Sequence, residues 1–145
     1  MKYLLDTNVL SEIRKPRGHE GVKAFVGSLR EDDIHISVLS VGEIAFGIEK
    51  LPPGPKKTEL RVWLSQKLPE RFGSRIIALE TDIMAEWGRL QAKTPNLPVF
   101  DSLIAASALA RRLTVVTRNV RDFERIEGLI LLNPWKEGSF LPKSK

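Results

Sequence analysis

The amino-acid sequence predicts an α/β fold with a mostly parallel sheet and helices on both of its sides. Short apolar runs, rich in β-branched or large aliphatic residues, recur along the chain, as expected of strands that are covered on both faces. Segments with helical periodicity separate these runs. Strands that alternate with helices in this way are typical of a parallel sheet.

The predicted elements follow one another along the whole chain. Strands are expected at 2–5 ("KYLL"), 33–37 ("DIHIS"), 75–79 ("RIIAL"), 114–117 ("TVVT") and 129–133 ("LILLN"). Helices are expected at about 7–14, 20–29, 38–50, 56–71, 81–93 and 100–112. Ser40 and Glu43 have the spacing of a capping box in the third helix. The "LPPGP" stretch then breaks the chain before the fourth helix.

Length and composition indicate one soluble domain. The chain has 145 residues, and its 42% hydrophobic and 28% charged content is ordinary for a globular protein. No apolar run approaches the ~18 to 20 residues of a membrane-spanning helix. Met1 leads directly into fold-like sequence without a signal peptide, so we expect a cytoplasmic protein without a membrane partner. The lack of cysteine excludes disulfides, thiolate zinc sites and cysteine nucleophiles.

The net charge of +5 favours a polyanionic partner, because lysine and arginine release counterions when they dock on a phosphate backbone. The basic residues are scattered through "RKPR", "ARR", "TRNVRDFER" and the final "PKSK". On charge alone, a solvated surface or tail is the better explanation.

Acidic and amide side chains converge on one edge of the predicted sheet. In open parallel sheets, the functional site lies beyond the carboxyl ends of the strands. Asp6 directly follows the first strand, and Asn119 and Asp122 follow the fourth. Glu43 lies near the start of the helix after the second strand, and Asp101 at the start of the last helix. Four separated parts of the sequence thus send polar groups to the same edge.

Carboxylates this close repel one another unless a cation lies among them. Magnesium suits such a pocket, because it prefers oxygen ligands and completes its shell with water and substrate phosphate. A metal beside a basic surface suggests phosphodiester hydrolysis by an activated water. Each acid also has a plain explanation, as a helix-start residue, a local cap or a surface ion pair. These explanations are good singly but do not account for the convergence.

Four motifs, in order and spacing, carry a family resemblance. "YLLDTNVLSEI", "SVLSVGEIAFGI", "PVFDSLIAASALARRLTVVTRNVRDF" and "LNPW" together resemble the PIN-domain ribonucleases of bacterial toxin-antitoxin systems, of the VapC and FitB type. The resemblance covers nearly the whole chain. It implies a three-layer α/β/α sandwich over residues 1–135, followed by a basic C-terminal tail at 136–145.

The resemblance also implies the roles of individual residues. The acids that would bind Mg²⁺ or Mn²⁺ and position the attacking water are Asp6, Glu43, Asp101 and Asp122, and the candidate polar contacts are Asn8, Thr117 and Asn119. Many PIN domains have an acid where this sequence has Asn119, and the next carboxylate comes only at Asp122. One-metal and two-metal mechanisms therefore both remain open.

The partners implied by the resemblance are an RNA substrate, a second copy of the chain in a homodimer, and a small antitoxin. The antitoxin's C-terminal segment would lie across a groove and place a basic side chain in the acidic pocket. Apolar candidates for this groove flank "LPPGP"; they are Ile44, Ile48, Leu60, Trp63 and Leu64. Core packing is an equally good use for the same side chains.

The predicted function is therefore a metal-dependent endoribonuclease that acts as the toxin of a type II toxin-antitoxin pair. Two alternatives remain. A haloacid dehalogenase-type phosphatase also begins with a strand that ends in Asp, but it needs a second acid where this chain has Asn8. A non-catalytic PIN-like protein that binds nucleic acid or a partner is favoured only by Asn119.

Overall fold

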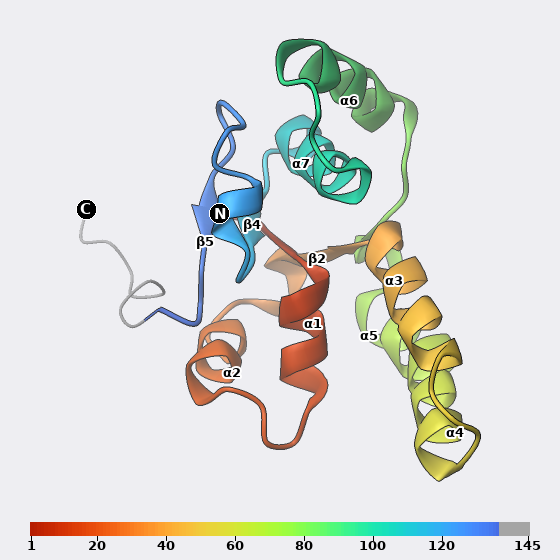
Figure 1. Ribbon diagram of the computed structural model, residues 1–145. Helices are drawn as coiled ribbons and strands as arrows, with labels where there is room; N and C mark the ends of the chain where they lie inside the picture. Colours follow the sequence, from red (N-terminus) through yellow and green to blue (C-terminus); the bar gives the residue numbers. More distant parts are fainter. Residues whose placement is uncertain (137–145) are drawn as a thin grey trace.

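A five-stranded parallel sheet lies at the centre of the computed structural model, which describes residues 1–136 (Figure 1). Its strands are β1 (Tyr3–Leu5), β2 (Ile34–Ser37), β3 (Ile76–Ile77), β4 (Thr114–Val116) and β5 (Leu131–Leu132). They lie in the order β3-β2-β1-β4-β5. The strand order reverses beside β1, so the residues that follow β1 lie at the switch point of the sheet.

The helices of the described residues are α1 (Thr7–Arg14), α2 (Glu20–Gly27), α3 (Val38–Glu49), α4 (Pro55–Val62), α5 (Leu68–Phe72), α6 (Thr81–Lys93) and α7 (Val99–Arg111). A π-helical segment, η2 (Trp63–Lys67), joins α4 to α5. Single 3-10 turns precede β2 and β3 and follow β4; they are η1 (Glu31–Asp33), η3 (Gly73–Arg75) and η4 (Val120–Asp122).

Helices cover both faces of the sheet, which confirms the predicted three layers. Leu4 and Leu5 are adjacent in β1, and their side chains point to opposite faces. Leu4 belongs to a core cluster with residues of α6 and α7, whereas Leu5 belongs to a second cluster with residues of α1, α2 and α5. Both leucines are fully buried. In Figure 1, α3 and α4 extend beside the sheet instead of covering it.

Strand register brings three chain segments to the same level. Leu5 pairs with Ile36 of β2 on one side and with Val116 of β4 on the other. The next residues along the chain are Asp6, Ser37 and Thr117. They therefore leave the sheet together, at the edge where the sequence predicts the site.

Two predicted features are wrong. The helix expected at 56–71 is interrupted by η2, in which the N–H of Leu68 bonds to the carbonyl of Trp63. Pro69 gives the reason, because it has no N–H for the carbonyl of Ser65 and its ring would clash with that carbonyl in a regular helix. The capping box at Ser40 is also absent, because α3 starts at Val38 with Ser37 as its N-cap. Ser40 therefore lies inside the helix and cannot cap it.

The edge strands are shorter than predicted. Of 75–79 only Ile76–Ile77 is paired, and of 129–133 only Leu131–Leu132. Each of these two strands has a partner strand on one side only. No helix within residues 1–136 is long and apolar enough to span a membrane. Of the predicted tail, 137–145 lie outside the described residues.

Candidate active site

Asp6 lies where β1 ends and α1 begins. Its carboxylate caps α1: Oδ1 accepts from the Thr7 N–H at 2.8 Å, and Oδ2 accepts from the Thr117 hydroxyl at 2.8 Å. Only 7% of Asp6 is exposed. Burial raises the pKa of its carboxyl, the hydrogen bonds lower it, and the charge of Asp122 raises it again. Asp6 is therefore a buried acid with hydroxyl and amide donors on one side and a second acid nearby.

Asn8 links α1 to the end of β4. Its amide nitrogen donates to Asp6 Oδ2 at 3.2 Å and to Thr117 Oγ1 at 3.3 Å, while its Oδ1 accepts from the N–H of Arg118 at 3.1 Å. An ionised Asp at this position could accept but not donate. Two of the three predicted polar contacts, Asn8 and Thr117, thus touch Asp6, and Asn8 is suited to a positioning role.

Glu43 projects from α3 toward α1. Its Oε1 accepts from the Thr7 hydroxyl at 2.7 Å, and the same hydroxyl oxygen lies 2.7 Å from Ser40 Oγ. Thr7 therefore contacts Glu43 through its side chain and Asp6 through its backbone. Thr7 in this way ties the acid of α3 to the acid that follows β1.

Asp101 lies in the first turn of α7 and is partly buried. Its pKa is raised to about 6, first by burial and then by the negative charges of Asp122, Asp6 and Glu43. Three acids from three other segments of the chain therefore act electrostatically on this single carboxyl. This is the convergence that the sequence predicts.

Asp122 ends the 3-10 turn η4, which follows β4. Asn119 begins this turn: its N–H donates to Thr117 Oγ1 at 3.0 Å, and its carbonyl accepts from the N–H of Asp122 at 3.1 Å. After burial, the charge of Asp122 has the largest effect on the pKa of Asp101. The structure thus brings the carboxylate of Asp122 into the electrostatic reach of the other acids, and Asn119 shapes the turn that carries it.

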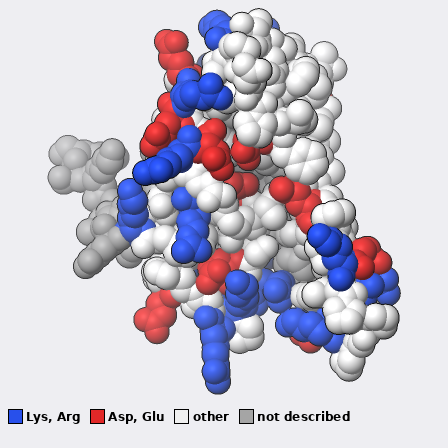
Figure 2. Space-filling view, in the orientation of Figure 1, with Lys and Arg blue, Asp and Glu red and all other residues white. Residues whose placement is uncertain are grey.

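Within residues 1–136, none of these four acids forms an ion pair with Lys or Arg. Acids elsewhere do, as in the pairs Glu31–Arg71 and Asp82–Arg111. Figure 2 shows acidic side chains across the middle of this face of the molecule. The pocket therefore carries uncompensated negative charge, which a bound cation would relieve.

The donor set suits a hard divalent cation, since it offers only carboxylate, hydroxyl and amide oxygens. No three acidic or histidine side chains of the described part of the chain form a ready-made group of metal ligands. Magnesium commonly takes one or two carboxylates and fills its shell with water, so an incomplete cage fits it. Asp6, which is buried where β1 ends, and Asp101, on which the negative charges of three other acids act, are the first candidates to hold the ion.

A groove leads away from Thr7 and Glu43. A cavity of about 250 Å³ begins at these residues and runs between α1, α3 and α4. Of the five apolar residues expected to form a docking groove, four line this cavity: Ile44, Ile48, Leu60 and Trp63. Leu64 instead packs against the core cluster beneath α1 and α2, and Ile44 and Trp63 also contact that cluster. The side chains thus line the groove and also contribute to core packing, and their use in docking stays a prediction.

Sequence reasoning missed three contributors to the site. Thr7 joins Asp6 to Glu43, Ser37 caps α3, and Ser40 contacts the Thr7 hydroxyl. Hydroxyl side chains beside a predicted strand end are common in loops, so their spacing alone does not mark them. The register that places Ser37 level with Asp6 is the signal that identifies them.

The sequence pattern of the PIN domain family matches residues 3–129, and the chain belongs to this family. Within it, the chain falls among the toxins of the FitB and VapC type. It is 34% identical to Toxin FitB of Neisseria gonorrhoeae, over 92% of this chain and 99% of that protein. It is 31% identical to the tRNA(fMet)-specific endonuclease VapC of Shigella flexneri, over 89% of this chain and 95% of that protein.

Solved structures show the same fold. FitAcB from Neisseria gonorrhoeae aligns with a TM-score of 0.83 and 32% identity, covering 92% of this chain and 98% of that one. VapBC2 from Rickettsia felis, bound to a DNA fragment from its promoter, aligns with a TM-score of 0.73 and 26% identity, covering 90% and 97% of the two chains. The three-layer PIN fold is thereby confirmed.

Proposed function

We propose that this protein is a metal-dependent endoribonuclease and the toxin of a type II toxin-antitoxin pair. The observation that carries the proposal is the gathering of four acids at one edge of the sheet, Asp6, Glu43, Asp101 and Asp122, where no Lys or Arg of the described chain pairs with them. Burial and the charges of the other three acids raise the pKa of Asp101. Membership of the PIN family and the ribonuclease names of its VapC relatives support this chemistry.

A Mg²⁺ or Mn²⁺ ion bound here would supply an activated water and neutralise charge on the phosphate. Asp6 and Asp101 would hold it, and Glu43 and Asp122 would orient the attacking water or a second ion. Thr117 and Asn8 donate to Asp6, so they favour its ionised form and fix the carboxylate in position. The Thr7 hydroxyl donates to Glu43 and holds its carboxylate in place.

The proposed partners follow from the groove and from the relatives. We propose that a small antitoxin lays an apolar segment over Ile44, Leu60 and Trp63 and directs a basic side chain toward the unpaired acids. Solved relatives are toxin-antitoxin complexes such as FitAcB and VapBC2, which supports a partner of this kind. We further propose that the chain acts as a cytoplasmic homodimer.

Cleavage of total cellular RNA by the purified chain, free of antitoxin, tests the nuclease. We expect cuts in Mg²⁺ or Mn²⁺ that disappear with a chelator and in Asp6→Asn. Folding of the variant is checked by thermal unfolding. Cuts that persist in Asp6→Asn would exclude this acid from the reaction, whereas the absence of cuts by folded, metal-loaded wild type would favour a non-catalytic binding protein.

Expression in cells tests the toxin role separately. We expect expression of the chain alone to arrest growth, and co-expression with its antitoxin to restore it. Harmless expression of a chain with proven nuclease activity would leave the enzyme in place and remove the toxin role. The phosphatase alternative is disfavoured by Asn8, whose amide is engaged with Asp6, Thr117 and Arg118.

A further inference from the structure

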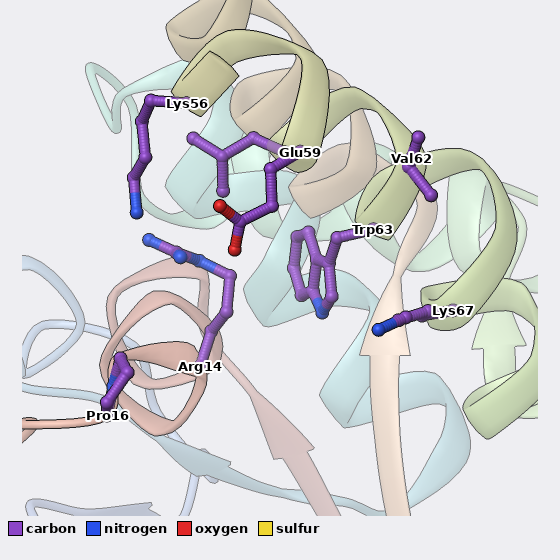
Figure 3. A pocket seen from close by; sticks show the side chains of 8 residues that line it. Arg14, Pro16, Lys56, Glu59, Val62, Trp63 and Lys67 are labelled. Carbon is purple, nitrogen blue, oxygen red and sulfur yellow. The ribbon is translucent and has the colours of Figure 1, made fainter.

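A second cavity, of about 450 Å³, continues the groove away from the acids. It lies between α1 and the helical segment formed by α4 and η2, and Figure 3 shows its side chains. Arg14, Leu60 and Trp63 line both this cavity and the groove that begins at Thr7 and Glu43. The two spaces therefore form one path from the candidate active site.

The lining of this cavity is strongly basic. Arg14 enters from α1, and Lys56 and Lys67 enter from α4 and η2, whereas Glu59 is the only acid among its lining residues. In Figure 3, the ends of Arg14 and Lys56 point into the same space. None of the three cations forms an ion pair within residues 1–136. Figure 3 shows the Glu59 carboxylate pointing into the same space, but the three cations outnumber it. This excess of positive charge favours a bound anion.

One helical face presents this lining. Lys56, Glu59, Trp63 and Lys67 follow one another at steps of three or four residues, which places them on the same side of the helix. The Arg14 guanidinium lies 5.7 Å from the centre of the Trp63 ring, in cation–π contact. Trp63 therefore fixes the direction of Arg14. A guanidinium held in this way is suited to a phosphate.

We propose that this cavity binds the phosphates of a single-stranded RNA flank that extends from the bond cut at the acidic pocket. The inference rests on the proposed ribonuclease function and adds a second region of RNA binding to it. Arg14, Lys56 and Lys67 would hold consecutive backbone phosphates without reading sequence. Trp63 is a positioning residue for Arg14. An antitoxin segment in the groove would close the path between cavity and acids.

The test compares short and long RNA substrates of the same cleavage sequence. The variants are Arg14→Gln, Lys56→Gln, Lys67→Gln and the triple variant, and the matched control is Lys93→Gln, an exposed lysine at the end of α6. We expect kcat/KM to fall for the long RNA and to stay unchanged for the short RNA. For binding of the long RNA in an Asp6→Asn background, the slope of log K against log salt should become less negative by about 0.7 for each phosphate that a variant no longer binds.

Each outcome decides the proposal. Cavity variants that behave like Lys93→Gln, in a wild type that cleaves RNA, would overturn the RNA flank and leave the nuclease intact. Variants that weaken only the salt-dependent binding of antitoxin would assign the cavity to an acidic peptide instead. A wild type that neither cleaves nor binds RNA would overturn the proposed function and this inference together.

Discussion

The Thr117 hydroxyl stabilises the ionised form of Asp6. It is fully buried and donates to Asp6 Oδ2 at 2.8 Å. This hydrogen bond lowers the pKa of the Asp6 carboxyl, which burial raises. An uncompensated buried carboxylate would be costly and would tend to take up a proton. Metal binding needs the carboxylate free of that proton. Thr117 therefore controls the pH range in which Asp6 can serve as a ligand.

Replacing Thr117 by Val keeps the shape and removes the donor. We expect the pKa of Asp6 to rise and the pH profile of cleavage to move to higher pH, with a loss of stability of about 1 to 3 kcal/mol. Cleavage rates measured across the acid and neutral pH range test the first effect, and urea unfolding measures the loss of stability. Thr114→Val, at the other end of β4, is the control. An unshifted profile in Thr117→Val would remove the hydroxyl from this role.

Asp101 makes the metal-free protein sensitive to pH. Its pKa rises from 3.8 to about 6 on folding, so the unfolded chain releases this proton at lower pH than the folded chain does. The contribution of Asp101 to the free energy of unfolding is therefore fully present below about pH 4. This contribution is lost as the pH rises through about 6.

Asp101→Asn should remove this loss. Between about pH 4 and 7 in a chelating buffer, we expect the melting temperature of the variant to fall less than that of the wild type. The reason is that Asn has no proton to release and no charge to repel its neighbours. Cleavage should be abolished in the same variant. Asp32→Asn, at an exposed acid without an ion pair in the described chain, is the control. Equal slopes in wild type and Asp101→Asn would contradict the electrostatic coupling.

At the scale of elements, α3 carries Glu43 to the site, and its start fixes where Glu43 lies. Ser37 ends β2 and accepts from the Leu39 N–H at 3.0 Å, so strand and helix meet without a loop. The helix therefore begins at the level of Asp6, and its second turn reaches the Thr7 hydroxyl.

Loss of this cap should weaken the element. Ser37→Ala is expected to lower the free energy of unfolding by about 0.5 to 2 kcal/mol, as other N-cap replacements do. Cleavage should fall less than after the loss of an acid, since Glu43 keeps its hydrogen bond with Thr7. Chemical unfolding measures the first effect, with Ser65→Ala in η2 as the control. Unchanged stability would mean that the cap is dispensable.

The elements show what could be predicted from sequence. Strand cores and the acids after them were predictable, because buried parallel strands leave continuous apolar runs and the site follows their carboxyl ends. The helix expected at 38–50 begins at Val38 as predicted, but its N-cap was not predictable, since Ser37 and Ser40 are both good cap residues and only strand register selects Ser37. The interruption of the helix at η2 was also not predicted, although the missing N–H of Pro69 indicates it.

At the scale of the whole molecule, one path joins Glu43, the apolar groove and the basic cavity. In Figure 1, α3 and α4 extend beyond the sheet. Residues of α3, α4 and η2 line one side of this path, and residues of α1 line the other. A partner that fills the groove would thus cover Glu43 and separate the acids from the basic cavity. Inhibition by such a partner needs no change of fold.

Gly47 offers a way to fill the groove without a partner. It lies in α3, lines the groove, and a Cβ added there meets nothing within 4 Å. Gly47→Leu should therefore fold normally, and its helix should gain stability because Gly is a poor helix residue. We expect binding of the antitoxin to weaken at least about tenfold, equivalent to ~1.4 kcal/mol. Cleavage of short RNA should stay near the wild-type rate, because the acids are untouched.

Gly88→Leu is the matched control, because Gly88 lies in α6, is exposed, and a Cβ there also meets nothing within 4 Å. Binding to the antitoxin is measured by titration calorimetry, and rescue of growth is followed by co-expression. Gly47→Leu should remain toxic in the presence of antitoxin, whereas Gly88→Leu should be neutralised. If both variants are neutralised equally, the antitoxin must reach the acids by another route, because a leucine at Gly47 would obstruct a segment lying between α1 and α3.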